Sequence, residues 1–269
     1  MSKELRENSL DLGPVNKLSP KGVNKILIRG TNWIGDAIMT LPAVASIRAT
    51  YPKAHIAVLV KPLVADVYRL FSDVDDVIIY EKKFDTPTGV LRLARTLKRE
   101  KFDLAILLQN AIEAAIIALA AGIPHRAGYD SDGRGLLLTH RVRRTREIKM
   151  VHQVDYYLEM VKALGCFAVD GEMNLRSRIQ LSDAIDVLRK FLPESEKDLI
   201  GIAPGATYGA AKRWFPDRFA GVADKIAERY GTRGMILGGK ADGETARNVQ
   251  EKAKVELINL AGKTNLREA

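Results

Sequence analysis

The sequence contains few of the residues that stabilise secreted proteins or build metal centres. Its 269 residues include one cysteine, Cys166, and four histidines. A single cysteine cannot form an internal disulfide, and no cysteine or histidine cluster has the spacing of a zinc site. We therefore expect a protein of a reducing compartment, the cytoplasm, without a structural metal.

Long hydrophobic runs are also missing. The longest, residues 114–123, is much shorter than the roughly 20 apolar residues that a transmembrane helix needs. Residues 1–22 have no apolar core of signal-peptide length, and they read as a flexible polar tail. We expect a soluble protein, for which contact with a membrane surface stays open.

Acidic residues are outnumbered by basic ones. The chain has 42 Lys and Arg against 33 Asp and Glu, a net charge of +9, which favours polyanionic partners such as nucleic acid, anionic lipid or phosphorylated sugar. Aromatic residues make up only 6%, and none interleaves the densest basic block, so we do not expect a nucleic-acid partner. This block is either a solvated surface or an anion-binding acceptor site; it contains Arg141, Arg143, Arg144, Arg146 and Lys149.

Apolar runs alternate with amphipathic ones after the tail, which predicts an α/β fold with parallel sheets. The length favours two domains, over residues 23–170 and 171–269. The expected strands cover residues 25–29, 55–60, 76–80, 103–109, 199–203, 233–237 and 257–260. The expected helices cover residues 42–51, 63–71, 90–100, 112–121, 152–165, 182–191, 217–230 and 243–253.

The end of the chain reads as the opening of another helix. Asn265 has the character of an N-cap residue, with Glu268 three positions later, yet the sequence stops at Ala269. We expect a C-terminal domain that is truncated after three strands. The alternative is a naturally frayed terminus.

Two segments, residues 26–43 and 200–216, run from an apolar strand through a glycine-containing loop into a helix. Such loops direct backbone N–H groups and a helix dipole toward one point, which suits an anionic ligand. The first segment carries the carboxylate of Asp36 and the second the ammonium of Lys212. A base and a phosphate-binding cation together suggest transfer of a group from a nucleotide donor.

The amino-acid sequences of these segments resemble those of a known family. RGTNWIGDAIMTLPAVASIRATYP and VDDVIIYEK in the first half, and GATYGAAKRWFPDRFAGVADKI, GMILGG and LINLAGKTNL in the second, are similar to the ADP-heptose:lipopolysaccharide heptosyltransferases, glycosyltransferase family 9. The similarity covers nearly all of residues 23–269 in order. Within the family, AKRWFP resembles heptosyltransferase II more than I.

The resemblance implies the GT-B architecture, with two Rossmann-like domains facing each other across a cleft. It implies an inverting transfer of heptose from ADP-heptose to the inner core of lipopolysaccharide, with no cofactor and no obligatory metal. The acceptor would bind the N-terminal domain and the nucleotide sugar the C-terminal one. We further expect a monomer in peripheral contact with the cytoplasmic surface of the inner membrane.

On the acceptor side, Asp36 is the candidate base, since it follows Gly35 in the first βα loop, where open parallel sheets bind ligands. The alternative is that Asp36 only caps the following helix. Cationic side chains are expected to meet the charges of the acceptor. The candidate acceptor-binding residues are Gly35, Arg126, Arg141, Arg143 and Arg144.

On the donor side, Lys212 is expected to bind the diphosphate with the help of Gly205 and Thr207. Its alternative is a solvated lysine near a helix start. Gly239 and Glu244 are expected near the ribose, where Rossmann-like sites often place a carboxylate. For Glu244 the alternative is an exposed first-turn carboxylate that complements the helix dipole.

Two other functions are weighed against transfer. A dinucleotide-dependent oxidoreductase would show a G-x-G-x-x-G fingerprint after its first strand, and the sequence has none. A non-catalytic protein that binds nucleotide sugars would keep the Lys212 loop without depending on Asp36. This second alternative gains weight because the later DSG-type segment of the family has no equivalent in residues 217–269.

Overall fold

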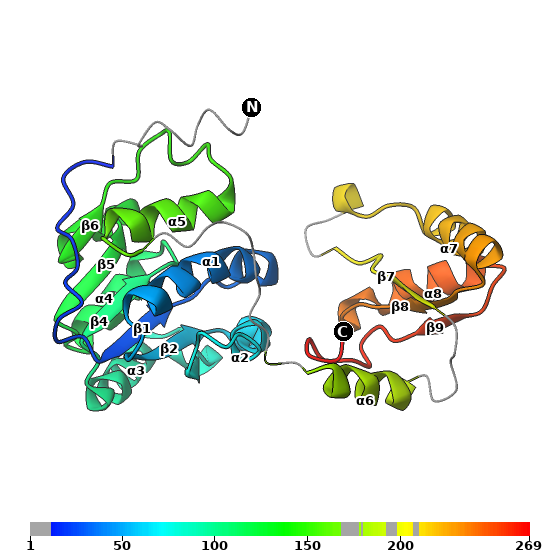
Figure 1. The fold of residues 1–269 in the computed structure, drawn as a ribbon, viewed down its shortest axis with the longest axis horizontal. Coiled ribbons are helices and arrows are strands. Elements are labelled where there is room, and N and C mark those ends of the chain that lie inside the picture. Colours follow the sequence, from blue (N-terminus) through cyan, green and yellow to red (C-terminus); the bar gives the residue numbers. More distant parts are fainter. Residues whose placement is uncertain (1–11, 168–177, 179, 192–197, 207–209) are drawn as a thin grey trace. The chain divides into compact units, whose positions relative to one another are not determined.

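A computed structural model describes residues 12–167, 178, 180–191, 198–206 and 210–269. The chain divides into two compact units, unit 1 (Met1–Arg178) and unit 2 (Ile179–Ala269) (Figure 1). The expected domain boundary at residues 170/171 lies outside the described residues. Each unit is an α/β fold around a parallel sheet, so the predicted fold class is confirmed.

Unit 1 contains a six-stranded parallel sheet with the order β3-β2-β1-β4-β5-β6. The strands are β1 Lys25–Arg29, β2 His55–Val60, β3 Asp76–Ile79, β4 Leu104–Leu107, β5 His125–Tyr129 and β6 His140–Val142. Because all strands are parallel, their carboxyl ends lie along one side of the sheet, which we call the carboxyl edge. Loops that leave this edge are where open α/β sheets bind ligands.

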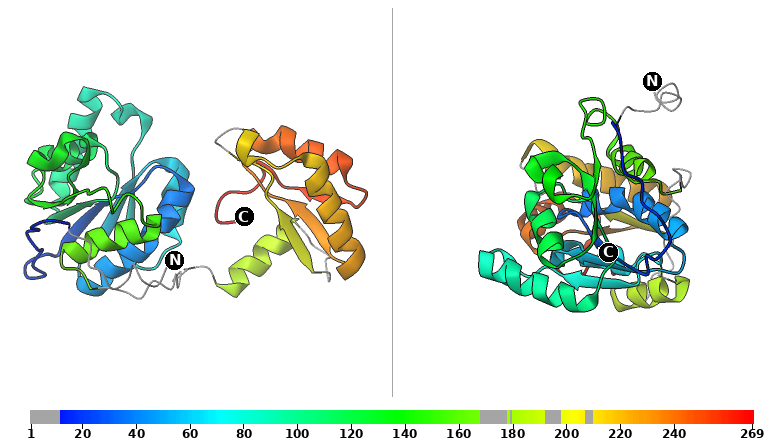
Figure 2. Two further views of the ribbon diagram at one scale, coloured as in Figure 1. Left: turned by 90° about the horizontal axis from the view of Figure 1, so that it is seen from above. Right: turned by 90° about the vertical axis from the view of Figure 1, so that its left-hand side faces the viewer.

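Helices cover both faces of this sheet (Figure 2). They are α1 Ile34–Thr50, α2 Ala65–Arg69, α3 Pro87–Glu100, α4 Ile112–Ala120 and α5 Gln153–Ala163. α1 packs along α5, and α3 along α4. None of the helices in the described ranges is long and apolar enough to cross a membrane.

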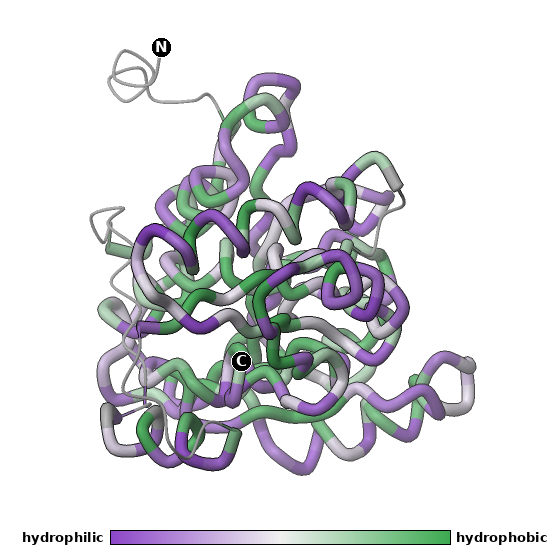
Figure 3. The backbone as a smooth tube through the Cα atoms, turned by 90° about the vertical axis from the view of Figure 1, so that its right-hand side faces the viewer, coloured by the Kyte–Doolittle hydropathy of each residue, from purple (hydrophilic) through white to green (hydrophobic). Residues whose placement is uncertain are grey.

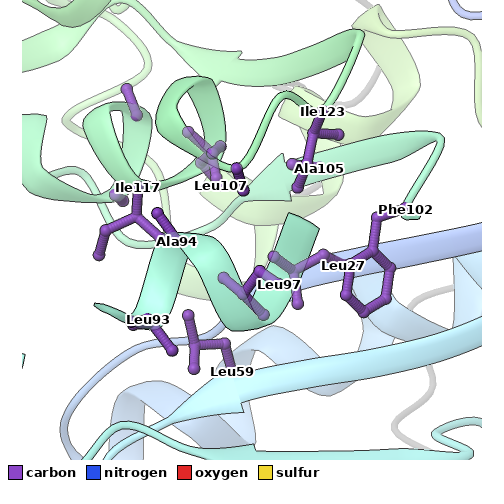
Figure 4. Packing of buried hydrophobic residues seen from close by; sticks show 14 of the residues in the cluster. Leu27, Leu59, Leu93, Ala94, Leu97, Phe102, Ala105, Leu107, Ile117 and Ile123 are labelled. Atoms are coloured by element: carbon purple, nitrogen blue, oxygen red, sulfur yellow. The ribbon is translucent and has the colours of Figure 1, made fainter. Parts of the chain in front are cut away.

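The core beneath α3 and α4 follows from the period-two pattern of the strands. Leu93 and Leu97 of α3 pack against Leu27, Leu59 and Leu107, which are each at most 1% exposed (Figure 4). Alternate strand residues point to the other face. Full burial of a leucine contributes about 1.5–3 kcal/mol relative to exposure, so this layer holds the carboxyl edge rigidly in place.

Unit 2 contains a three-stranded parallel sheet with the order β7-β8-β9. Its strands are β7 Leu199–Ile202, β8 Arg233–Ile236 and β9 Leu257–Asn259, and its helices are α6 Leu181–Phe191, α7 Pro216–Tyr230 and α8 Gly243–Lys252. Ile202, Ile236 and Leu257 pack against Ala220 of α7 and Ala246 of α8. Figure 3 colours the backbone by hydropathy, and hydrophobic and hydrophilic stretches alternate along the chain.

Helix α1 begins eight residues before the expected start, and Pro42 lies inside it. The prediction placed Pro42 at the first helical position, where its missing N–H costs nothing. In the structure the helix accepts a proline in its interior, at the cost of one backbone hydrogen bond. The early start places Asp36 in the first turn of α1 and not in the loop.

Residues 12–18, which the sequence assigned to a flexible tail, pack against unit 1. Leu12 and Leu18 are 7% and 9% exposed. The N–H of Arg143 donates to the Leu12 carbonyl at 3.2 Å, and the N–H of Leu18 donates to the Leu164 carbonyl at 2.8 Å. Two buried leucines explain the difference, because their burial offsets the entropy lost on ordering the segment.

The capping pattern predicted at the chain end is present. The Asn265 side chain accepts the N–H groups of Arg267 and Glu268 at 2.9 and 3.0 Å. In return the Glu268 carboxylate accepts the N–H of Asn265 at 3.0 Å. These reciprocal hydrogen bonds satisfy the donors of a helical turn.

Candidate functional site

Asp36 lies at the carboxyl edge of unit 1, directly after β1. Trp33 is the N-cap residue of α1 and Asp36 is the third residue of the helix, so the alternative that Asp36 is the cap is wrong. Its side chain is half-buried, and no residue within the described ranges donates a hydrogen bond to its carboxylate. A first-turn carboxylate that is favoured by the helix dipole and has unused acceptor capacity is suited to receiving a proton from a bound hydroxyl.

Tyr157 of α5 is under the electrostatic influence of Asp36. This ring is 4% exposed, and burial, together with the negative charge of Asp36, raises the pKa of the Tyr157 hydroxyl. The two residues belong to helices α1 and α5, which pack against each other.

Arg29, the last residue of β1, anchors the loop between β1 and α1. This side chain is 2% exposed, and its Nη1 donates to the carbonyls of Gly30 and Leu59 at 2.9 and 3.0 Å. Its guanidinium lies 5.1 Å from the ring centroid of Tyr80. Burial lowers the pKa of Arg29 to about 10, and the charge of Glu113 acts in the opposite direction. Arg29 stays charged at neutral pH and ties the loop before α1 to β2.

Gly30 is required at the start of this loop. A methyl group added there would come within 2.5 Å of Val60 Cγ1 and 3.0 Å of the Tyr68 hydroxyl. That hydroxyl shares a 2.8 Å hydrogen bond with Thr40 of α1. Close approach of the loop to Tyr68 thus sets where the first turn of α1 begins.

A second polar group lies on the carboxyl edge, after β4, β5 and β6. Arg134 is fully buried and donates to the carbonyl of Tyr129 at 2.7 Å and to that of Gln109. The Asn110 amide donates to the Tyr156 hydroxyl at 2.9 Å. Burial lowers the pKa of Arg134 to about 10, so the residue holds these loops as a cation. The sequence feature that indicates this polar group is the pair Gln109-Asn110, which directly follows an apolar strand.

Arg144 joins this second group, whereas the other predicted acceptor residues lie elsewhere. Its guanidinium lies 5.7 Å from the Tyr156 ring centroid, and its Nε is buried without a hydrogen-bond partner. Arg143 is exposed just after β6. Arg141 is exposed on β6 and lines a pocket of about 280 Å³ with Pro14, Leu136 and others.

Arg126 and Gly35 complete the predicted acceptor residues. Gly35 is exposed in the first turn of α1, next to Asp36. Arg126 is the second residue of β5, so it lies toward the opposite edge of the sheet from Asp36. There it donates to the carbonyls of Leu137 and Ile123 at 2.7 and 2.6 Å. The structure therefore brings Gly35 and Asp36 together and separates Arg126 from them.

In unit 2, the loop after β7 carries the predicted donor residues. Lys212 ends the short 3₁₀ turn Ala210–Lys212 and is exposed. The next residue, Arg213, donates from Nε and Nη2 to the carbonyl of Ala206 at 3.1 and 3.0 Å. Gly205 precedes Ala206 at the carboxyl end of β7. The expected contribution of Thr207 lies outside the described residues.

The loop after β8 is closed by Asp242. Its Oδ2 accepts the N–H of Gly239 at 2.9 Å, which removes that N–H from the donors open to a ligand. Glu244 is the second residue of α8 and is exposed. Both alternatives for Glu244, ribose contact and dipole complement, fit this position.

The described residues were also compared with the requirements of a metal site. Across residues 12–167 and the described parts of unit 2, no three His, Cys, Asp or Glu side chains form a group that could hold a metal ion. The chemistry that the two edges offer consists of carboxylates, hydroxyls, guanidinium groups and a lysine.

Comparison with known proteins gives consistent matches. Residues 90–269 match the sequence profile of glycosyltransferase family 9 (heptosyltransferase). Lipooligosaccharide heptosyltransferase 2 of Haemophilus influenzae is 30% identical over 260 residues, which cover 91% of this chain and 73% of the relative. Lipopolysaccharide heptosyltransferase 2 of Escherichia coli is 27% identical over 261 residues, with the same coverage.

Solved structures agree with the sequence matches. The structure of E. coli ADP-heptose lps heptosyltransferase II superposes with a TM-score of 0.79 at 25% identity, over 91% of this chain and 74% of the other. A glycosyltransferase family 9 protein from Veillonella parvula has a TM-score of 0.78 at 23% identity, over 91% and 71%, and supports the fold alone. The predicted resemblance is thereby confirmed, and the chain belongs to glycosyltransferase family 9, the heptosyltransferases.

Proposed function

We propose that the chain transfers a heptose from ADP-heptose to the inner core of lipopolysaccharide, with inversion at the anomeric carbon. The oxygen of an acceptor hydroxyl attacks that carbon, its proton passes to the Asp36 carboxylate, and the bond to ADP breaks. The observation that carries the proposal is the half-buried Asp36 at the carboxyl edge of unit 1, to which no described residue donates a hydrogen bond.

We assign the donor to unit 2. Lys212 is proposed to neutralise the charge that develops on the departing diphosphate, as cations do at phosphate sites. Glu244 is proposed to accept from the ribose hydroxyls. No metal is required by this proposal, because the lysine supplies the positive charge.

We assign the acceptor to unit 1. Arg144, with its buried and unpaired Nε, is the strongest candidate for an anionic group of the core sugars. Arg141 and Arg143 are exposed on the same segment, and Leu136 and Met150, 93% and 82% exposed, flank it. We propose that this basic segment lies against an anionic lipid surface, and that the chain acts there as a monomer. Arg126 is left out because its guanidinium is already bonded to carbonyl groups.

Replacement of Asp36 by asparagine tests the proposed base. Asp36→Asn is expected to lower kcat about 100-fold or more, because the amide cannot accept the proton, while the affinity for ADP stays within about twofold. The assay follows ADP release with ADP-heptose and an inner-core acceptor. The matched control is Asp66→Asn, which changes another first-turn carboxylate, on α2, that is ion-paired with Arg69 at 3.0 Å.

Each result has a clear reading. Activity that survives in Asp36→Asn would refute the base assignment. ADP binding with no transfer by the unsubstituted chain would favour the non-catalytic nucleotide-sugar binder. Loss of activity in both variants alike would show a general effect of first-turn charge and not a specific role of Asp36.

A further inference from the structure

Asp242 connects two loops of unit 2 that are far apart in the sequence. It ends the 3₁₀ turn Lys240–Asp242, which follows β8. Its Oδ2 accepts the N–H of Gly239 at 2.9 Å and closes this turn. The carboxylate is thus fixed in direction at the carboxyl edge of β8.

The same carboxylate lies against the backbone of the loop after β7. A methyl group added at Gly205 would come within 2.2 Å of Asp242 Cγ and 2.3 Å of its Oδ1. At Gly238 an added methyl group would lie 3.1 Å from Asp242 Cβ. Side-chain atoms do not approach a Cβ as closely as 2.2 Å, so only glycine at position 205 permits this contact.

The contact continues toward Lys212. Gly205 is followed by Ala206, whose carbonyl accepts both hydrogen bonds from Arg213 at 3.1 and 3.0 Å. Lys212 is the neighbour of Arg213 in the chain. A path of direct contacts therefore leads from the Asp242 carboxylate through Gly205, Ala206 and Arg213 to the backbone of Lys212.

We infer that Asp242 is a positioning residue for the donor diphosphate, which fixes Gly205 and, through Ala206 and Arg213, the location of Lys212. This inference rests on the proposed function, because it takes Lys212 as the phosphate-binding residue. Asp242 itself does not bind the phosphates, since a carboxylate repels them and it occupies the N–H of Gly239. The turn after β8 therefore supports the proposed phosphate site through Asp242, and it does not itself bind the phosphates.

Calorimetric titration of the full chain with ADP and with adenosine tests the inference. Asp242→Ala is expected to weaken ADP binding about tenfold, the effect of one misplaced charged contact, and to change adenosine binding less than twofold. Asp242→Asn is expected to restore ADP binding to near the original value, because the amide oxygen can still accept the N–H of Gly239. A general loss of structure would weaken both ligands and would not be rescued selectively.

Gly205→Ala provides a second measurement that does not depend on how Asp242→Ala folds. It is expected to weaken ADP binding as Asp242→Ala does, since the new methyl group displaces the carboxylate. In the double variant the two losses should not add, because removal of the Asp242 side chain makes room for the methyl group. Additive losses would overturn the inference.

Asp224→Ala is the matched control. Asp224 Oδ1 also accepts backbone N–H groups, those of Lys254 and Val255 at 2.8 and 3.0 Å, but before β9 and away from the carboxyl edge. It should lower the thermal stability and leave ADP affinity unchanged. Equal ADP affinity in the unsubstituted chain and Asp242→Ala would overturn the positioning role alone. Absence of ADP binding by the unsubstituted chain would overturn the proposed function and this inference with it.

Discussion

Removal of the Lys212 ammonium is the change that tests the donor assignment most directly. Lys212→Ala deletes one exposed cation from the β7 loop and leaves the hydrogen bonds between Arg213 and Ala206 in place. The contact between Arg213 and Ala206 should therefore be retained, and a loss of affinity that is confined to phosphate-bearing ligands reports on the charge of Lys212.

The expected magnitude follows from the exposure of Lys212. A hydrogen bond from a charged donor contributes about 1.5–3 kcal/mol. Because water screens an exposed lysine, the lower value applies, and about 1.4 kcal/mol corresponds to a tenfold change in dissociation constant. Lys212→Ala should thus weaken ADP binding about tenfold and leave adenosine, which has no phosphate, unaffected. The loss should shrink as salt is raised.

Calorimetry with ADP, AMP and adenosine at two ionic strengths measures this dependence. Lys225→Ala is the control, because Lys225 is an exposed lysine of the same unit on α7 and the variant has the same net charge. ADP affinity that is unchanged in Lys212→Ala, or reduced equally in both variants, would refute the phosphate assignment. Equal losses for ADP and adenosine would show that the substitution disturbs the loop and not the phosphate contact.

Two further predictions concern unit 1. Partial burial acts to raise the pKa of Asp75, but the N–H of Ile56 and the Arg48 guanidinium, at 2.7 and 2.5 Å, lower it overall. The resulting stability is present above the unfolded pKa and lost as the pH falls through the folded pKa, so Asp75→Asn should cost about 1 kcal/mol at pH 7 and little in strong acid. Urea unfolding at both pH values checks this; an equal loss at both would contradict it. Second, a variant with Arg141→Ala and Arg143→Ala should bind anionic lipid vesicles more weakly, by about 1 kcal/mol of binding free energy per residue. Co-sedimentation with the vesicles measures this loss. Binding that is unchanged, or equal on neutral vesicles, would remove the lipid proposal.

The strands that the sequence predicted are those whose composition matches their burial. KILIR and HIAVLV, at β1 and β2, are apolar on both faces because helices cover both sides of the sheet. β5 and β6 were missed because HRAGY and HRV carry polar residues and a glycine. Gly128 of β5 has a reason that only the fold supplies: a methyl group there would lie 3.0 Å from the Leu107 carbonyl and 3.2 Å from Arg134 Nη2.

The locations of the candidate residues could be predicted where they depend on position along the chain. They could not be predicted where they depend on contacts between segments that are distant in the sequence. Asp36 and Lys212 follow strands, and a strand end in a parallel sheet lies at the carboxyl edge regardless of the rest of the fold. The contact of Asn110 with Tyr156, and of Asp242 with Gly205, joins segments that the alternation of strands and helices does not relate. Long-range side-chain contacts of this kind have no periodic signature.

The packing of residues 12–18 has a consequence for association between copies of the chain. β6 is the last strand of the six-stranded sheet, and such a strand offers unpaired N–H and C=O groups to any other extended chain. Here the Leu12 carbonyl accepts from the N–H of Arg143, and Pro14 lines the same pocket as Thr139 and Arg141. Proline has no N–H with which to continue a ladder. Residues 12–14 therefore lie at this end of the sheet and hinder the pairing of β6 with a second chain.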